Sequence, residues 1–322
     1  MDNQKMMKNV DVIILSWDRE EETLAAIKSA EAQVDVEFKI YVLDQGSNDN
    51  CKKVLKDYCD RRENIFWAEN EFNTGVPGGR NQASFLGHSD VIVSLDNDAE
   101  FEHERVLKDT LDVFNSNDKL AVACFRVSLF GKKDIDKSSW SYGMSHEEWG
   151  FKQFYTTRFV GAGHAIRRDL FTSVKGYDAD LFFLHEEVEL ARRFINLGYT
   201  ICYFPHLAVG HKVSSERRIS WSGERWRYHV RNKTYLTLKY RNTFMAALFH
   251  IVLLLRDSIK MKQLVGSTKA AFDGFKMYLR NKHRFVSSEC RFNTESELYY
   301  RTYTPGAGGS LITRVKQRLR GK

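Results

Sequence analysis

Short β-rich runs alternate with helical segments along the first two-thirds of the chain. The β-rich runs cover residues 10–15, 38–43, 65–68, 91–95, 120–125 and 199–204. Helical patterns cover residues 20–32, 50–58 and 103–114. Strands separated by helices of about a dozen residues form βαβ units with right-handed crossovers, and such units build a parallel sheet. The sequence therefore predicts an α/β fold with a mostly parallel central sheet flanked by helices.

Two carboxylates follow the apolar run 91–95 without an intervening turn. Asp96 and Asp98 would lie at the carboxyl end of a buried parallel strand, where open α/β sheets bind their ligands. Mg²⁺ and Mn²⁺ prefer oxygen ligands and are commonly held by one or two carboxylates together with substrate phosphates. The alternative is a surface Asp-x-Asp string that caps the next helix. Because a buried strand precedes the pair, we favour a site for a metal diphosphate.

Residues 75–81 and 131–150 are two polar, glycine-containing stretches. The first matches neither a P-loop nor G-x-G-x-x-G, so we expect a loop entering a helix, with Arg80 either facing a pyrophosphate or solvated. The second carries Trp140 and Trp149 among Ser and Gly. Long loops of this kind often form lids or substrate platforms, so either Trp could stack on a sugar or anchor the local core.

An acidic helix start follows a turn near residue 178. Glu186 and Glu189 share one face of the expected helix, whereas Glu187 is rotated away from them. The apolar residues 182–184 could raise the pKa of one carboxylate and make it a general base. The alternative is a solvated acidic helix start balanced by the two arginines that follow. His211, after the last run, could complete a metal site with the aspartate pair.

The C-terminal third differs in charge from the rest of the chain. Residues 1–205 carry 25 Lys and Arg against 35 Asp and Glu, whereas residues 206–322 carry 24 against 7. Residues 221–240 are basic and aromatic, and the apolar run 245–255 is shorter than the ~20 residues that span a bilayer. That run could lie in a membrane interface or pack as a core helix, and the basic tail from residue 304 is a candidate for disorder or lipid contact. No nucleic-acid-binding signature accompanies the basic residues, so we do not expect nucleic acid as a partner.

Two domains are therefore expected: a catalytic domain over 1–212 and a basic, aromatic, mainly helical region over 213–322.

Five scattered cysteines without C-x-x-C spacing indicate a reduced compartment, and residues 1–8 contain no apolar segment typical of a signal peptide. We expect a cytoplasmic protein with peripheral contact to the inner face of an anionic membrane.

The order of these motifs resembles the family 2 glycosyltransferases of the GT-A fold, particularly the bacterial rhamnosyltransferase-like branch. The resemblance covers roughly residues 9–242 and implies an inverting enzyme that uses a nucleotide-diphosphate sugar. It implies that Asp44 contacts the base, Asp96 points toward the ribose, and Asp98 binds the metal together with His211. The other residues it assigns to the donor are Ser16, Asp18, Arg19, Asn73, Gly75 and Arg80, and those it assigns to the acceptor or sugar side are Gly161, Ala162, Gly163 and Glu186.

Three positions depart from the family pattern. Asp18 and Gln45 each stand where the family usually has Asn, and Glu187 aligns with the usual catalytic Asp, so the candidate base is one methylene longer. The resemblance implies that Glu187, or Glu186 as the fallback, takes a proton from an acceptor hydroxyl as that oxygen attacks the anomeric carbon. The acceptor would be a glycan or a lipid-linked sugar, the donor a UDP- or dTDP-sugar, and the cofactor Mn²⁺ or Mg²⁺.

Two other classes of function remain open from the sequence. A nucleotidyltransferase would share the α/β frame, but residues 16–19 lack the basic, glycine-rich loop expected directly after its first strand. A non-catalytic nucleotide- or glycan-binding, membrane-associated protein with a relic fold is the second alternative. The retained carboxylates and His211 argue against it.

Overall fold

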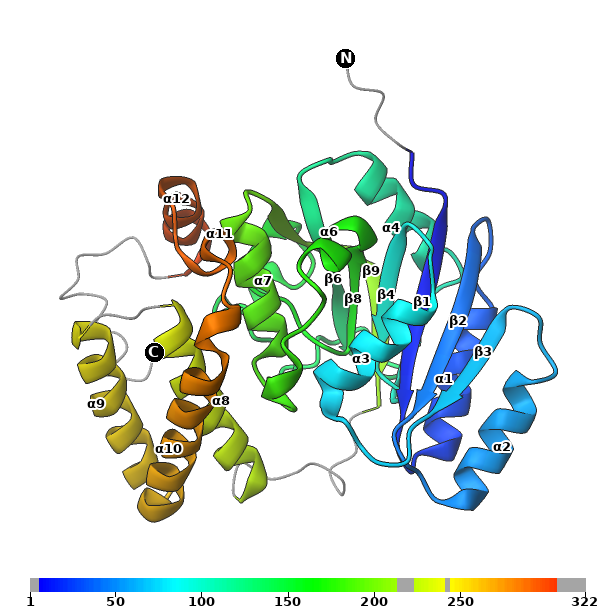
Figure 1. The fold of residues 1–322 in the computed structure, drawn as a ribbon. Helices are drawn as coiled ribbons and strands as arrows, with labels where there is room; N and C mark the ends of the chain where they lie inside the picture. The colour runs from blue at the N-terminus through cyan, green and yellow to red at the C-terminus, as the bar shows by residue number, and fades with distance from the viewer. Residues whose placement is uncertain (1–5, 213–222, 241–243, 306–322) are drawn as a thin grey trace.

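The computed structural model describes residues 6–212, 223–240 and 244–305, with a mixed sheet at its centre (Figure 1). The strands are β1 (Asn9–Ser16), β2 (Glu37–Asp44), β3 (Ile65–Glu69), β4 (Val91–Leu95), β5 (Ala99–Phe101), β6 (Leu120–Leu129), β7 (Phe154–Tyr155), β8 (Gly163–Arg167) and β9 (Thr200–His211). Their order within the described ranges is β3-β2-β1-β4-β8-β6-β9-β5, and β7 pairs with β9. The expected α/β fold is confirmed.

Helices cover both faces of this sheet, so its central strands are buried on both sides. The helices of the α/β part are α1 (Glu20–Glu31), α2 (Asp49–Cys59), α3 (Gly75–Leu86), α4 (Val106–Asn115), α5 (His146–Trp149), α6 (Arg168–Ser173) and α7 (Glu186–Asn196), with a 3₁₀ turn η1 (Ala179–Leu181). Helices α1, α2 and α4 contribute to one hydrophobic cluster, and α3, α6 and α7 contribute to the other. Successive residues of β1 alternate between them: Val12 and Ile14 lie in the first and Ile13 in the second.

The two halves of the sheet differ in strand direction. Strands β1 to β4 are parallel, as the βαβ pattern predicts. Strand β8 then runs antiparallel between β4 and β6, while β6 and β9 are parallel to each other. The short strands β5 and β7 were not expected, because two or three residues show no periodicity of their own. Both are antiparallel partners of β9.

Two expected boundaries change in the structure. Strand β9 does not end near residue 204 but continues to His211, past an irregularity in its pairing with β6. His211 is therefore the last residue of a strand and not part of a following loop. Helix α3 begins at Gly75, which places Arg80 in its second turn and not at its start.

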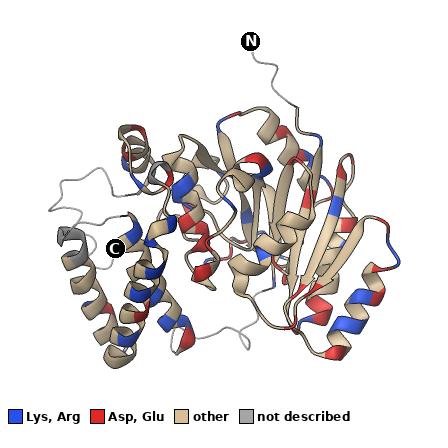
Figure 2. Ribbon diagram, in the orientation of Figure 1, with Lys and Arg blue, Asp and Glu red and all other residues tan. Residues whose placement is uncertain are grey.

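The C-terminal helices pack on the α/β part. They are α8 (Glu224–Tyr240), α9 (Phe244–Lys260), α10 (Leu264–Asn281), the 3₁₀ turn η2 (Lys282–Arg284), α11 (Ser287–Cys290) and α12 (Thr294–Tyr303). Leu181 is buried in a cluster with Tyr235 and Tyr240 of α8, and the Tyr299 hydroxyl of α12 hydrogen-bonds the backbone of Ile201 in β9. Figure 2 shows Lys and Arg recurring along α8 and α10. The expected boundary at 212/213 falls at the edge of residues 213–222, which lie outside the described ranges, as does the basic tail beyond residue 305.

Candidate active site

The aspartate pair lies where β4 meets its antiparallel neighbour β8. Leu95 is in register with Gly163, and the Asp96 N–H donates to the Ala162 carbonyl at 3.3 Å. The small residues 161–163 therefore adjoin Asp96. A Cβ added at Gly161 would lie 2.8 Å from both the Arg80 guanidinium and the Glu187 carboxylate, so a side chain there would displace one of these two groups.

Pairing between β5 and β9 brings His211 to Asp98. Ala99 is opposite His211 in the antiparallel register, and His211 Nε2 lies 3.3 Å from Asp98 Oδ1. The other ring nitrogen, Nδ1, is 2.9 Å from Oδ2 of Asp136, a buried residue of the 131–150 loop. Sequence analysis missed Asp136, because no motif links that loop to the end of β9. A carboxylate on the far nitrogen of a histidine fixes its tautomer and orientation, as around metal-ligating histidines.

The charges at this cluster depend on one another. Burial would lower the pKa of His211, but its hydrogen bonds to Asp136 and Asp98 raise that pKa to about 10. Burial would raise the pKa of Asp98, but His211 and Arg19 together hold it below its usual value. The pKa of Asp136 is likewise held below its usual value, chiefly by the hydrogen bond to His211 against the effect of burial. Without a metal, His211 is thus a cation between two carboxylates at neutral pH.

The donor atoms fit a hard divalent cation that takes the rest of its ligands from substrate and water. Asp98 and His211 converge, and Asp136 orients the histidine ring. The described ranges contain no group of three His, Cys, Asp or Glu side chains able to hold a metal by themselves. Mg²⁺ commonly binds one or two carboxylates and completes its shell with phosphate oxygens. The Arg19 guanidinium, which pairs with Asp98, would have to turn away for a cation to bind.

Arg80 connects the donor-side carboxylate to the acidic helix start. Its Nη2 donates to Asp96 Oδ1 at 2.8 Å and to the Gly161 carbonyl at 3.0 Å, while Nη1 donates to Glu187 Oε1 at 3.0 Å. Burial would lower the pKa of Arg80, but the charges of Asp96 and Glu187 raise it above its usual value. Arg80 is buried, so the solvated alternative is wrong. It forms a rigid fork between the two carboxylates.

The three glutamates of α7 have different surroundings. Glu187 is 16% exposed and paired with Arg80. Glu186 is buried, and burial together with the charge of Glu187 raises its pKa to about 8. Glu189 is also buried, but Arg193, Lys239 and the Tyr240 hydroxyl hold its pKa at about 2 despite the burial. Glu189 therefore ties α7 to α8, and Glu187 is the member of the group that a substrate hydroxyl could reach.

The segment before these glutamates has an unusual backbone. Phe182, Leu184 and His185 have φ values of 60°, 70° and 74°, a region that residues with a Cβ rarely adopt. The buried Asn232 of α8 donates its amide to the Leu181, Phe183 and Leu184 carbonyls at 2.8–2.9 Å. We call residues 181–185 the clamped segment. A helix distant in sequence thus determines how α7 presents Glu187.

The clamped segment also contacts the start of α3. The Val76 N–H donates to the Phe182 carbonyl at 2.8 Å. Gly75 has a φ of +79°, and a Cβ there would lie 2.3 Å from that carbonyl oxygen, so glycine is required on both counts. The Asn73 side chain accepts from the Gly75 N–H at 2.8 Å. Asn73 and Gly75 therefore shape the helix start, which links α3 to α7.

The remaining donor-side residues form interlocked turns at the ends of β1 and β2. Asp44 is buried and accepts from the Gly46 and Ser47 N–H groups at 2.9 Å. Asp18 accepts from the Asn48 backbone and side chain at 2.8 Å. Ser16 is buried opposite Asp44 in the parallel register. These contacts bring Ser16, Asp18 and Asp44 together at one edge of the sheet.

The comparison with known families decides the class of protein. A model described as glycosyl transferase family 2 matches residues 11–174, about half of the chain. The chain belongs to glycosyl transferase family 2. It is thus an enzyme of a family that transfers sugars from nucleotide-sugar donors.

The named relatives of the chain are distant. A glucosyl-dolichyl phosphate glucuronosyltransferase of Haloferax volcanii is 24% identical over 225 residues, which are 66% of this chain and 71% of that protein. An O-antigen chain rhamnosyltransferase of Salmonella anatum is 26% identical over 190 residues, 56% of this chain and 58% of the relative. The expected rhamnosyltransferase-like branch thus matches the name of one distant relative, and other relatives have different names.

Solved structures show the same GT-A-like fold. A mannosyltransferase of Pyrobaculum calidifontis in complex with GDP-Man and Mn²⁺ superimposes with a TM-score of 0.53 at 15% identity, over 97% of this chain and 87% of that one. GalNAc-T7 with UDP, GalNAc and Mn²⁺ gives a TM-score of 0.66 at 14% identity, over 92% of this chain and 57% of that one. At these identities the likeness is one of fold.

The two tryptophans assigned to the sugar side pack in an aromatic cluster of this family 2 enzyme. Trp140 makes edge contacts with Tyr142 and Tyr203 at centroid distances of 4.9 and 5.7 Å, and its indole N–H donates to the Met144 carbonyl. Trp149 contacts Phe154 at 5.8 Å. Both rings thus help to anchor the 131–150 loop, and because both remain partly exposed, stacking of either on a sugar stays a prediction.

Proposed function

We propose that this enzyme is an inverting glycosyltransferase that moves a sugar from a UDP- or dTDP-sugar to a hydroxyl of a glycan or lipid-linked acceptor in polysaccharide or glycoconjugate synthesis. The observation that carries the proposal is the Arg80 fork, which holds Asp96 on the donor side and Glu187 in one arrangement. A lipid-linked or O-antigen acceptor is supported by the names of the distant relatives, and the rhamnosyltransferase-like branch by one of them.

Glu187 is the proposed general base. It is ionisable and partly exposed, and Arg80 fixes its orientation, whereas Glu186 is buried and would have to move to meet a hydroxyl. In the proposed step the acceptor oxygen bonds to the anomeric carbon as the carbon–oxygen bond to the diphosphate breaks. The hydroxyl proton passes to Glu187, and attack from the face opposite the leaving group inverts the configuration.

Asp98 and His211 are the proposed holders of Mn²⁺ or Mg²⁺. When bound, such an ion supplies positive charge to the departing diphosphate. The chain's own residues orient this part of the site: Asp136 keeps His211 Nδ1 engaged, so Nε2 is directed to Asp98. Because Arg19 also lies at Asp98, we propose that its guanidinium turns to a phosphate oxygen when donor and metal arrive.

The first test is isothermal calorimetry of the purified chain with UDP, dTDP and GDP, each with and without Mn²⁺. We expect metal-dependent binding of UDP or dTDP that Asp98→Ala abolishes, while Glu187→Gln binds the nucleotide normally. Asp112→Ala, at an exposed carboxylate of α4, is the matched control. The proposed site would be overturned if no nucleotide binds. It would also be overturned if nucleotide affinity is the same with and without metal and is unchanged by Asp98→Ala.

Transfer is tested next, with the nucleotide sugar that calorimetry selects and a panel of glycan and lipid-linked acceptors. Glu187→Gln should lose transfer while keeping donor binding, and product analysis by NMR should show an inverted anomeric configuration. Retention of configuration, or full activity of Glu187→Gln, would refute the mechanism. Nucleotide binding without turnover on any acceptor would favour the non-catalytic alternative.

A further inference from the structure

Helix α9 has two different faces. On one face, His250 Nε2 lies 2.9 Å from the Thr234 hydroxyl of α8, Ser258 is buried, and Leu254 packs against the buried cluster of α8 and α10. The other face exposes Leu248, Ile251, Val252, Leu255 and Ile259, each between 45% and 66% accessible. This spacing is one continuous helical stripe. A stripe of large apolar side chains on the outer face of a helix indicates an interaction surface.

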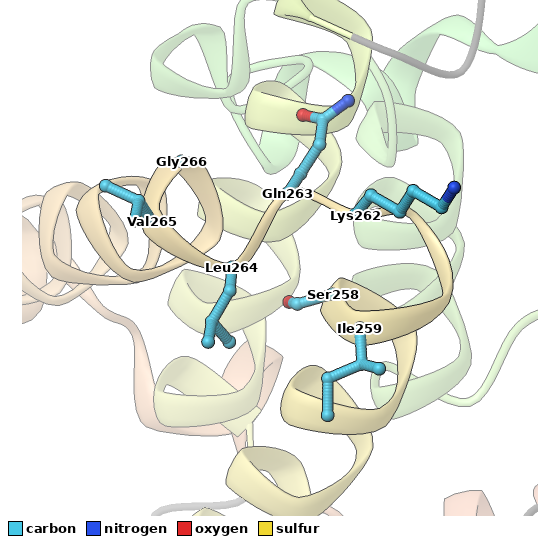
Figure 3. A pocket seen from close by; sticks show the side chains of 7 residues that line it. All are labelled: Ser258, Ile259, Lys262, Gln263, Leu264, Val265 and Gly266. Carbon is cyan, nitrogen blue, oxygen red and sulfur yellow. The ribbon is translucent and has the colours of Figure 1, made fainter.

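The apolar surface continues around the turn into α10. Ile259, Leu264 and Val265 line an open hollow of about 500 Å³ between the end of α9 and the start of α10 (Figure 3). Leu264 and Val265 are both exposed. We call the stripe of α9 together with these two residues the α9–α10 apolar face.

Exposed lysines lie at the α9–α10 turn and along α10, beside the α9–α10 apolar face. Lys260 and Lys262 are exposed, and Lys262 is one of the residues that line the hollow (Figure 3). On α10, Lys269 and Lys276 follow Val265 at helical spacing and share its face, with the Lys276 ammonium 4.5 Å from the ring of the exposed Phe272. Residues 244–286 contain eight Lys and Arg against two Asp and Glu.

The charge pattern selects the occupant. A second copy of the chain would use the same patch on both subunits in a two-fold dimer, and would bring two sets of lysines against each other. A partner that is apolar in its interior and negatively charged at its border would match both the apolar stripe and the lysines. Bilayers with anionic headgroups have this character, and helices with an apolar stripe and basic flanks lie in their interface. The described helices include none long and apolar enough to cross a bilayer.

We propose that the α9–α10 apolar face docks this enzyme on an anionic lipid surface, with the stripe entering the headgroup region and the neighbouring lysines contacting lipid phosphates. The α8 helix, which clamps the segment before Glu187, packs directly on α9 and α10. Docking would therefore place the acceptor side of the enzyme near the bilayer. The binding itself requires neither donor nor acceptor, and is independent of the proposed transfer reaction.

The test is co-flotation of the full chain with vesicles of phosphatidylcholine alone and of phosphatidylcholine mixed with phosphatidylglycerol. We expect flotation with the mixed vesicles only, weakening with added salt because exposed charges are screened. The double substitution Ile251→Asp with Leu255→Asp should lower the partition coefficient by about tenfold or more. Lys260→Glu with Lys262→Glu should weaken binding to mixed vesicles while leaving the apolar stripe intact.

Leu298→Asp is the matched control, because Leu298 is an equally exposed leucine on a different C-terminal helix, α12. It should float like the unmodified chain, and all variants should keep the same thermal unfolding midpoint, since the altered side chains are exposed. Absence of flotation with the mixed vesicles would overturn the proposal. So would flotation that survives the double substitution, or a stable dimer that the double substitution dissociates.

Discussion

The substitution Asn232→Ala tests whether the C-terminal helices position the catalytic carboxylate. Asn232 is fully buried, and its amide lies 2.8 Å from the Phe183 and Leu184 carbonyls. Leaving these two half-buried carbonyls without this donor costs at most about 1–3 kcal/mol each, or ~2–6 kcal/mol together. Holding three residues with a Cβ at positive φ costs ~1–2 kcal/mol each, or about 3–6 kcal/mol. The hydrogen bonds and the backbone strain are thus of similar size.

Because these two energies nearly balance, we expect the clamped segment to relax when the amide is removed. The net free energy of unfolding should then fall by under about 2 kcal/mol, since relief of the backbone strain offsets the lost hydrogen bonds. Relaxation would shift the start of α7 and with it Glu187. A misplacement of about 1 Å at a reacting group can lower turnover ~100-fold. Nucleotide affinity should fall much less than kcat, because Asp98 and His211 lie on other elements and the clamped segment reaches the donor side only at the start of α3.

The measurements are urea unfolding, calorimetric nucleotide affinity with Mn²⁺, and kcat for transfer. Asn281→Ala is the matched control, because Asn281 is a buried asparagine of α10 whose amide donates to the Asp180 side chain and not to the clamped segment. It should lose stability but keep kcat. An Asn232→Ala variant with the full loss of stability and an unchanged kcat would refute a positioning role, as would an equal loss of nucleotide affinity.

Three further predictions concern the site itself. Asp136→Asn should weaken Mn²⁺ affinity in the nucleotide complex about 10–100-fold, because the carboxylate at His211 Nδ1 is lost; calorimetry that finds unchanged affinity would contradict this role. Arg80→Met should lower the free energy of unfolding by ~3 kcal/mol, because Glu187 loses its buried counter-charge, and an unchanged urea midpoint would refute it. Glu186 has a folded pKa raised to about 8 from 4.5, so its stabilising contribution is complete below pH 4.5 and is lost as pH rises toward 8. Glu186→Gln should therefore gain stability relative to the unmodified chain across that range in pH-dependent urea unfolding, and a constant difference would argue against the raised pKa.

Much of the parallel half of the sheet follows from local sequence. Runs such as 10–15 and 91–95 are apolar enough to be buried on both faces, and the turn and helix signals between them are local. The same local patterns marked Asp96, Asp98 and the acidic start of α7. Strand β5 could not be foreseen, since three residues become a strand only when β9 supplies its hydrogen-bonding partner.

The roles of individual side chains depended on contacts between distant segments. Arg80 was expected near a helix start, and only the folded chain places it between Asp96 and Glu187. Asp136 and Asn232 carry no motif, and their partners lie 75 residues away at His211 and 48–51 residues away in the clamped segment. Conversely, Trp140 stood out by its residue type, yet its ring is used for packing.

The sequence alone determined the layers of the fold and which carboxylates lie near strand ends, because hydrophobic periodicity and turn chemistry act over a few neighbouring residues. The tertiary structure decided how those groups are paired, protonated and oriented. Strand register brings His211 to Asp98, burial raises the pKa of Glu186, and α8 holds the backbone before α7. These properties depend on distances and local dielectric environment, which exist only once segments far apart in the chain have packed together.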